Sequence, residues 1–298
     1  MATYYIEVGS GESGDGSLSD PFHIDSQADL DNILNGGYAG STASASGDIY
    51  IFLDGTYASG LRINADGHDG LTFRSLNTFG AYFANVNLGP QGDTTGNILT
   101  RSSESTTFEK LHFEISTYFK AGGGTLTLTL CKVDSSSTPG GYGTFQMGGY
   151  APGGVFDKWL PTNLYFDRCL IINNSSSHEL FNRRATNHTI TNAKDHPDNL
   201  SFSKCTIVGK STQPIFEGGS GSTITIQMNN SIVYGEAGTT TDNTSYETFS
   251  NSANNWGYRF GNSNLPSIGS TDPLFEDTTT DNYRLKPNSP CIGMSTVS

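Results

Sequence analysis

The densest group of titratable residues in the sequence lies between residues 178 and 196. It contains Arg183, Arg184, His188 and Lys194, and three of the six histidines of the chain fall in this segment. Such side chains can donate or abstract protons when a site holds them against a substrate. We regard these four residues as candidates for acid–base chemistry. The alternative, which we favour, is a polar loop whose charges pair with a neighbouring subunit.

Aromatic residues gather in two stretches that are otherwise rich in small and polar residues. Exposed aromatic side chains stack on sugar rings or are buried against a partner subunit. Covering the flank of their own domain is an equally good interpretation. The candidates for a binding surface or an interface are Tyr142, Phe145, Tyr150 and Trp159 in the first stretch and Trp256 and Tyr258 in the second.

One loop near the start offers oxygen ligands for a metal ion. Glu12, Asp15 and Asp20 supply the carboxylates that Ca²⁺ prefers, but their spacing matches no known calcium loop, and turn formation explains them better. The four cysteines form no CxxC pair, which argues against zinc. We therefore expect no cofactor, with calcium in this loop as the alternative.

The elements that must position these residues follow from a recurring six-residue pattern. It reads apolar, two variable residues, Leu or Cys, one variable residue, apolar. Copies occupy 108–113, 128–133, 166–171 and 202–207, and a looser copy with one inserted residue occupies 226–232. The pattern predicts one type of strand that recurs in stacked repeats. Cys131, Cys169 and Cys205 share one position of it, so we expect them to stack inside as free thiols.

The composition favours an all-β chain with a thin core. Hydrophobic residues make up 34% of the chain and charged residues 15%, with 36 glycines, which is little for a bulky α/β core. The 17 Phe and 14 Tyr argue against disorder. A net charge of −13 argues against nucleic acid or an anionic membrane as a partner. No stretch approaches the roughly 20 apolar residues that cross a bilayer.

The first 46 residues are predicted to form an N-terminal region that differs from the repeats. Ser26 can cap a helix over 27–34, with Leu30, Ile33 and Leu34 on one face. Such a helix could hide the open apolar end of a stack of repeats. The first eight residues lack the basic and apolar regions of a secretory leader, so we expect no export by that route.

Three separated segments resemble right-handed parallel β-helix proteins of the pectate-lyase-like superfamily. They are 4–8 followed by 16–22, then 48–57, then 272–275 followed by 283–293. The resemblance implies an all-β, single-stranded right-handed parallel β-helix (a solenoid) with an N-terminal α-helical cap and long lateral loops. It implies a single domain over 1–298. Within it, 1–46 form the N-terminal strand, loop and capping helix, 47–236 the repeats, and 237–298 an aromatic and polar C-terminal cap.

The resemblance fixes function less well, because the fold carries lyases, hydrolases, adhesins and phage proteins. Hydrolases of this fold use clustered Asp residues, and no Asp–Asp pair occurs in a repeat strand. We expect a non-enzymatic surface protein of a virus particle, a capsid decoration protein or a tail-associated adhesin, made in the host cytoplasm. We expect a homotrimer that contacts other virion proteins and binds a surface glycan.

The alternative function is a secreted or virion-borne polysaccharide lyase or glycoside hydrolase that acts on an acidic polysaccharide. Lyases of this fold abstract a proton with Lys or Arg, so Arg183 or Arg184 would act with His188 or Lys194. In both cases we expect the recurring strands to be scaffold. Function would then lie in the long excursions at 139–161 and 175–198.

Overall fold

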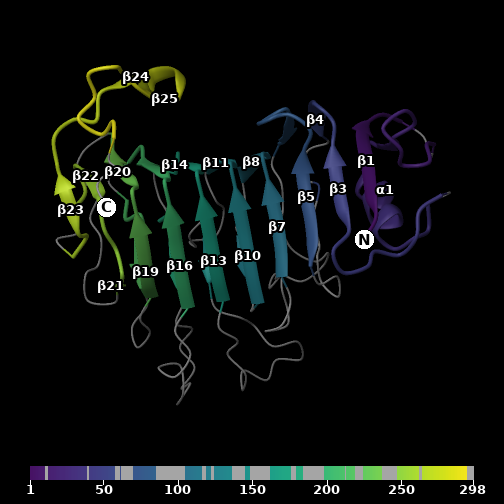
Figure 1. The fold of residues 1–298 in the computed structure, drawn as a ribbon, viewed down its shortest axis with the longest axis horizontal. Helices are drawn as coiled ribbons and strands as arrows, with labels where there is room; N and C mark the ends of the chain where they lie inside the picture. The colour runs from purple at the N-terminus through teal and green to yellow at the C-terminus, as the bar shows by residue number, and fades with distance from the viewer. Residues whose placement is uncertain are drawn as a thin grey trace, which may run out of the picture.

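The computed structural model of the chain consists mainly of parallel β-sheets, with one α-helix among the residues it describes (Figure 1). The described residues are 1–10, 13–38, 40–57, 61, 70–84, 105–115, 119–121, 124–135, 145–147, 162–175, 179–183, 198–211, 213–218, 224–236, 247–261 and 264–293. Successive strands fall into the larger sheets in turn, and each pairs with its equivalent in the next repeat. This arrangement confirms the expected all-β class with stacked parallel strands.

A ten-stranded sheet faces the viewer in Figure 1. Its strands, in spatial order, are β2 (Phe22–Ile24), β1 (Thr3–Val8), β3 (Ile49–Phe52), β5 (Leu71–Ser75), β7 (Ser105–Glu109), β10 (Gly124–Thr129), β13 (Thr162–Asp167), β16 (Asp198–Ser203), β19 (Ile224–Asn229) and β21 (Glu247–Phe249). Every neighbouring pair in it is parallel.

A nine-stranded sheet runs along a second face. Its strands, in spatial order, are β23 (Ser267–Gly269), β22 (Asn255–Tyr258), β20 (Ile232–Gly235), β17 (Thr206–Gly209), β14 (Leu170–Asn173), β11 (Lys132–Ser135), β8 (His112–Ile115), β6 (Ala81–Phe83) and β4 (Gly55–Tyr57). A four-stranded sheet contains β18 (Phe216–Gly218), β15 (Phe181–Arg183), β12 (Phe145–Met147) and β9 (Phe119–Ala121).

In five successive repeats, one residue with a left-handed backbone turns the chain from the ten-stranded to the nine-stranded sheet. Lys110, Leu130, Arg168, Lys204 and Asn230 have φ between 52° and 61°. Their N–H groups donate to carbonyl groups of the next repeat, for example from Lys110 to Thr129 at 2.9 Å. These bonds hold a conformation that costs an L-residue roughly 1–2 kcal/mol. The bend fixes which residues of each repeat point outward.

The interior consists of ladders of like side chains in register. Phe108, Leu128, Phe166, Phe202 and Met228 are direct partners along the ten-stranded sheet. The rings of Phe166 and Phe202 stack with centroids 5.0 Å apart. Burying each such side chain contributes about 1.5–3 kcal/mol. The last copy of the pattern needs no inserted residue, because Met228 pairs with Phe202 and Val233 with Ile207, so it runs from 228 to 233.

The cysteine ladder is confirmed. Cys131, Cys169 and Cys205 are free and buried. The Sγ–H of Cys169 donates to the carbonyl oxygen of Leu128 at 3.3 Å, and that of Cys205 to Phe166 at 3.4 Å. Burial raises the pKa of the Cys131 and Cys205 thiols well above the usual range.

Helix α1 (Gln27–Leu34) begins where the sequence predicts. The Ser26 side chain accepts from the Asp29 N–H, and the Asp29 carboxylate accepts from the Ser26 N–H, which completes a capping box. Leu30, Ile33 and Leu34 are buried, and the helix contacts β2. Closure of the open end of the stack by this helix stays a prediction.

The C-terminal hairpin packs on the outer surface of the nine-stranded sheet. It consists of β24 (Phe275–Asp277), the 3₁₀ turn η2 (Thr278–Thr280) and β25 (Asn282–Leu285), and the two strands are antiparallel. Its apolar residues Phe275 and Tyr283 form a second core cluster with Val208 and Trp256. The tail therefore covers part of one face of the molecule.

Candidate functional site

Equivalent outward positions of the nine-stranded sheet are polar in the earlier repeats and mostly apolar in the later ones. Their side chains lie one and three residues after the buried Leu or Cys of each repeat, or after Ser231, which takes its place in the last one. The first position holds His112, Lys132, Leu170, Thr206 and Ile232, and the second holds Glu114, Asp134, Ile172, Val208 and Tyr234. The apolar half, from β14 onward, contributes Ile172, Val208 and Tyr234 to the cluster that the hairpin covers. The polar half is left outside that cluster.

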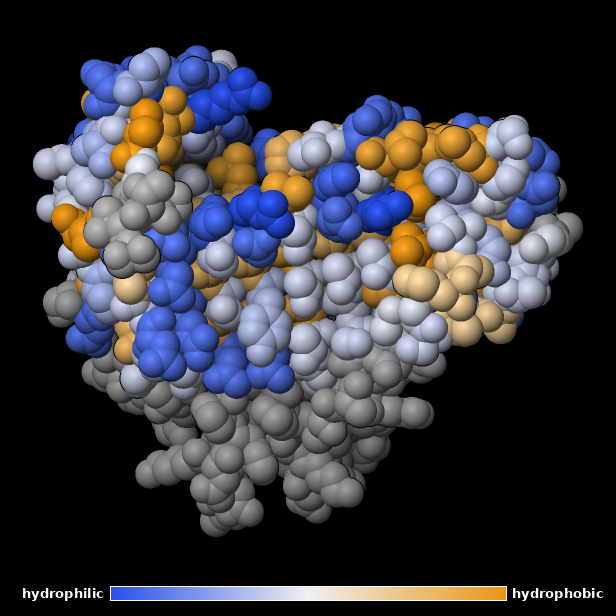
Figure 2. All heavy atoms as spheres, viewed as in Figure 1, coloured by the Kyte–Doolittle hydropathy of each residue, from blue (hydrophilic) through white to orange (hydrophobic). Residues whose placement is uncertain are grey.

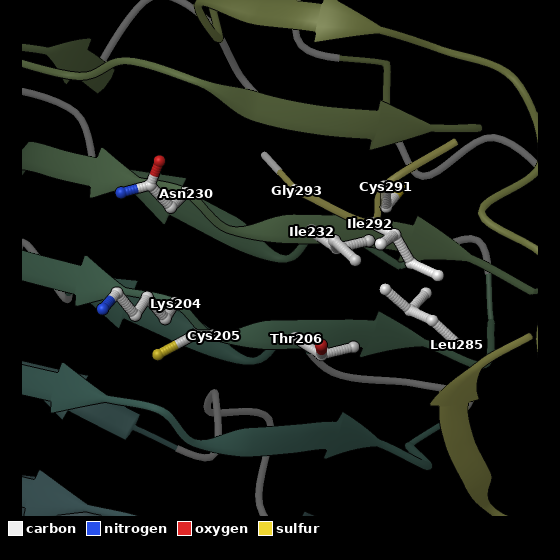
Figure 3. A pocket seen from close by; sticks show the side chains of 9 residues that line it. All are labelled: Lys204, Cys205, Thr206, Asn230, Ile232, Leu285, Cys291, Ile292 and Gly293. Carbon is white, nitrogen blue, oxygen red and sulfur yellow. The ribbon is translucent and has the colours of Figure 1, made fainter. Parts of the chain in front are cut away.

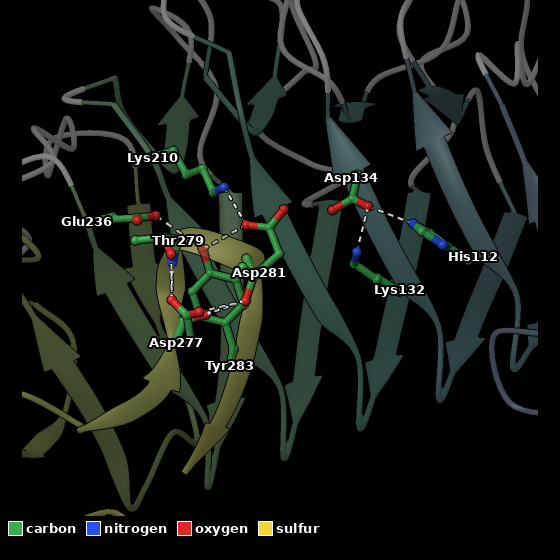
Figure 4. A network of polar contacts seen from close by, with 10 residues as sticks. His112, Lys132, Asp134, Lys210, Glu236, Asp277, Thr279, Asp281 and Tyr283 are labelled. Atoms are coloured by element: carbon green, nitrogen blue, oxygen red, sulfur yellow. Dashed lines mark hydrogen bonds and ion pairs between the residues drawn. The ribbon is translucent and has the colours of Figure 1, made fainter. Parts of the chain in front are cut away.

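We call this polar half, with the adjoining Tyr82 of β6, the polar cluster: Tyr82, His112, Glu114, Lys132 and Asp134. Asp134 lies at its centre. His112 Nε2 lies 2.6 Å and Lys132 Nζ 2.9 Å from Asp134 Oδ2 (Figure 4). The three side chains are 15–20% exposed. Oδ1 of Asp134 is buried and has no hydrogen-bond partner.

The electrostatics of the cluster keep Asp134 ionised. Burial raises its pKa, but hydrogen bonds from His112 and Lys132 and the charges of both lower it, and the net pKa lies below the usual range. Tyr82 donates its hydroxyl hydrogen to Glu114, and its ring lies 4.7 Å from the His112 ring. That hydrogen bond, with burial and the nearby carboxylates, raises the pKa of Tyr82 to about 12.

The C-terminal hairpin lies beside the polar cluster and borders it on one side. Lys210, which follows β17, forms an ion pair with Asp281 at the tip of the hairpin. Tyr283 donates to Glu236 at 3.1 Å, which ties the hairpin to the end of β20 (Figure 4). Figure 2 shows a hollow between this lobe and the first strands of the sheet. A ligand in the hollow would meet the fixed donors and acceptors of the cluster.

A separate cavity of about 270 Å³ lies under the C-terminal segment (Figure 3). Its lining residues are Lys204, Cys205, Thr206, Asn230, Ile232, Leu285, Cys291, Ile292 and Gly293. The volume is below that of ordinary small-molecule sites, about 300–1,000 Å³. We assign no ligand to it.

The acid–base candidates of the long loop fall almost wholly outside the described residues. Arg184, His188 and Lys194 lie outside them, and Arg183 is described only as the last residue of β15. Their part in a reaction stays a prediction. The polar cluster does not include any of them.

The aromatic candidates occupy different surroundings. Tyr142, Tyr150 and Trp159 lie outside the described residues. Phe145 is fully buried and stacks on Phe181 at 4.9 Å, because β12 turns this residue inward, so of the interpretations left open its contacts favour packing within its own domain.

The second aromatic stretch covers its own domain. Trp256 is 9% exposed, and its Nε1 donates to the Thr271 carbonyl oxygen at 2.8 Å beneath the C-terminal segment. Tyr258 is half-buried, stacks on Tyr234 at 5.3 Å and carries Arg259 over its ring. Of the interpretations left open, these contacts favour flank coverage for both residues.

The N-terminal loop uses its carboxylate for a turn. Asp15 Oδ1 accepts from the Ser17 N–H at 2.9 Å. A hydrogen bond from the Ser17 hydroxyl, together with this one from the Ser17 N–H, lowers the pKa of Asp15. The backbone oxygen of Asp20 accepts from the Asp15 N–H at 3.0 Å. Glu12 lies outside the described residues, so a calcium site there stays a prediction. Across the described ranges, no three His, Cys, Asp or Glu residues are grouped to hold a metal ion.

The polar cluster comes from the recurring strands, which we had expected to be scaffold alone. His112 and Lys132 share the last variable position of the pattern, and Glu114 and Asp134 directly follow its last apolar residue. Aligning the copies of the pattern on their Leu or Cys would have brought these four residues together. An Asp–Asp pair within one strand does not reveal these four residues, because they are neighbours between strands and not along one strand.

Comparison with family models, with curated proteins and with solved structures found no match to this chain. Within the described ranges, no helix is long and apolar enough to cross a membrane.

Proposed function

We propose that the chain is a right-handed parallel β-helix protein that binds a glycan at the polar cluster without cleaving it. The stacked parallel sheets support the fold, and the resemblance of the terminal segments supports the superfamily. One observation carries the function: the outer face of the sheet holds a fixed set of hydrogen-bonding side chains in the hollow beside the hairpin. Sugar hydroxyls need such donors and acceptors, and the Tyr82 ring adds an apolar face.

The pKa shifts of two members of the polar cluster fit binding better than catalysis. A general acid or base works best with a pKa near the working pH. The pKa of Tyr82 is raised to about 12 and that of Asp134 is lowered, so both move away from neutrality. Tyr82 remains a donor and Asp134 an acceptor, which are the roles that recognition needs.

The test is retention of a panel of neutral and acidic polysaccharides by the immobilised protein. Tyr82→Phe removes one hydroxyl and should weaken binding about tenfold, equal to about 1.4 kcal/mol. Tyr165→Phe removes the same atom from the outer face of the ten-stranded sheet and should leave binding unchanged. Failure of the wild type to retain any polysaccharide, or equal effects of the two variants, would refute the proposal.

A second candidate is cleavage of a glycosidic bond, because Glu114 and Asp134 are direct partners in adjacent strands. Glycosidases use two carboxyl groups that flank the scissile bond. Reducing sugar released by the wild type and lost in Glu114→Gln would establish cleavage. Product absorbance from an unsaturated uronate would instead indicate a lyase. Binding without either product supports recognition alone.

We also propose that the protein is a component of a virus particle, as the resemblance implies, in contact with other virion proteins. The free, buried cysteines agree with synthesis in a reducing compartment. Neighbouring genes for capsid or tail proteins would support this location. Purified particles that lack the protein would exclude it.

A further inference from the structure

The outer face of the ten-stranded sheet has little charge. Thr125, Thr127 and Thr129 of β10 point outward, and so do the alternate residues of the next three strands. Those residues are Asn163, Tyr165, Asp167, Asn199, Ser201, Ser203, Thr225, Gln227 and Asn229. Asp167 is the one charged residue among these twelve, and its carboxylate pairs with Arg168 at 2.7 Å.

The charges on the N-terminal side of the face are paired, including Glu7 of β1, whose carboxylate lies 2.6 Å from His23 Nε2 of β2. β5 and β7 present Thr72, Arg74, Thr107 and Glu109, and Arg74 is the direct partner of Glu109. Opposite charges on neighbouring strands offset each other. The chain as a whole carries a formal charge of −13. A surface whose few charges are paired is where two copies of such a chain can approach with little repulsion.

The shape and the content of the face fit a protein partner. Figure 2 shows it turned toward the viewer, with mostly pale residues along its middle. Tyr165, near its centre, is 42% exposed although β13 is an inner strand of the sheet. Tyrosine at the centre of a flat surface is typical of the residues that dominate protein interfaces. Asn199 donates to Asn163 Oδ1 at 2.8 Å, so neighbouring amides are already held in place.

The area is sufficient for a stable contact. Ten strands at about 4.8 Å and five residues per strand at about 3.3 Å give a face of roughly 48 by 17 Å, or about 800 Å². A specific interface of ordinary size buries about 800 Å² on each partner. A single glycan chain would cover only a narrow strip of this face, and ligands of that size favour concave sites.

We propose that copies of this chain associate through the outer face of the ten-stranded sheet, around Tyr165. The occupant is a second copy of the chain, packed face to face, so this contact by itself forms a dimer and not the homotrimer expected from the resemblance. This contact is independent of glycan binding at the polar cluster, which lies on the other large sheet.

The test is the mass of the full chain in native mass spectrometry and sedimentation. The wild type should be an oligomer. Thr127→Lys places a positive charge beside Tyr165 in every copy and should shift the protein to monomer, with at least a tenfold weaker association. Thr56→Lys makes the same change on β4, in the nine-stranded sheet, where Thr56 is exposed, and should leave the oligomer intact.

Circular dichroism of both variants shows whether each remains folded. Tyr165→Ala provides a second disruption that adds no charge and should also weaken association. A monomeric wild type would overturn the proposal, and so would an oligomer that tolerates both Thr127→Lys and Tyr165→Ala. A folded monomer in which Tyr165→Ala abolishes polysaccharide retention would assign the face to a glycan instead.

Discussion

Replacing Asp134 by Asn should destabilise the protein at neutral pH and have little effect in acid. The change keeps the shape of the side chain and removes the charge that His112 and Lys132 contact at 2.6 and 2.9 Å. Hydrogen bonds to a charged group contribute about 1.5–3 kcal/mol each. The amide oxygen still accepts from one donor, and the site is partly exposed, so we expect a loss of about 1–2 kcal/mol.

The lowered pKa of Asp134 determines how the difference in stability between the two proteins changes with pH. The pKa of Asp134 in the folded protein lies below the roughly 3.9 of an unfolded aspartate. Its contribution to stability is therefore fully present above that unfolded value and is lost as the pH falls through the folded pKa. Wild type and Asp134→Asn should differ in free energy of unfolding at pH 7 and converge once the carboxylate is protonated.

Urea unfolding of both proteins at pH 7 and at several lower pH values measures the difference. Asp20→Asn is the control, because that side chain is exposed in the N-terminal loop and should show almost no effect at any pH. Equal stability of wild type and Asp134→Asn at pH 7 would refute the reasoning. A difference that persists undiminished in strong acid would also refute it, because it would be due to packing and not to charge.

Three further predictions concern the scaffold. Leu130→Gly should stabilise the protein by about 0.5–1 kcal/mol in denaturant unfolding, because the relief of left-handed strain at φ 55° exceeds the entropic cost of ordering a glycine. Leu130→Ala keeps a Cβ atom and should bring no gain. The four cysteines should resist a thiol reagent in the native protein and all react in denaturant; rapid labelling of native protein would contradict their burial. Phe202→Ala should lower the free energy of unfolding by about 3–5 kcal/mol, while Ser201→Ala, on the outward face, should change it by less than about 0.5 kcal/mol.

The sequence was sufficient for features that depend on local chemistry or on strict repetition. The Ser26 cap follows from local hydrogen bonding, and the stacking of Cys131, Cys169 and Cys205 follows from their shared position in the pattern. The repetition of the pattern was predicted correctly, but a copy such as 128–133 does not form one strand. Its first two residues end β10 of the ten-stranded sheet, Leu130 and Cys131 form the bend, and its last two residues begin β11 of the nine-stranded sheet. The last copy of the pattern was predicted two residues too early at its start and one too early at its end, because Ser231 takes the place of Leu or Cys.

Features that depend on the register between repeats, or on which segment covers which face, could not be obtained in the same way. Glu114 and Asp134 are 20 residues apart and become neighbours only through strand pairing. The burial of Trp256 depends on a segment that returns over the sheet from residues beyond 270. Phe145 sits in a Gly-rich stretch that suggests a loop, whereas its pairing with Phe181 places it in a strand.

The pairing of each strand with the preceding repeat has a consequence for how the chain acquires its structure during synthesis. In each new repeat, the strand of the ten-stranded sheet pairs with a strand that was synthesised earlier, as β13 pairs with β10. Each finished repeat leaves one unpaired edge that can serve as the template for the next. The hairpin is different, because Phe275 and Tyr283 must reach back to strands made up to about a hundred residues before. The polar hollow, which the hairpin borders, can therefore form only after both the sheet and the hairpin have been made.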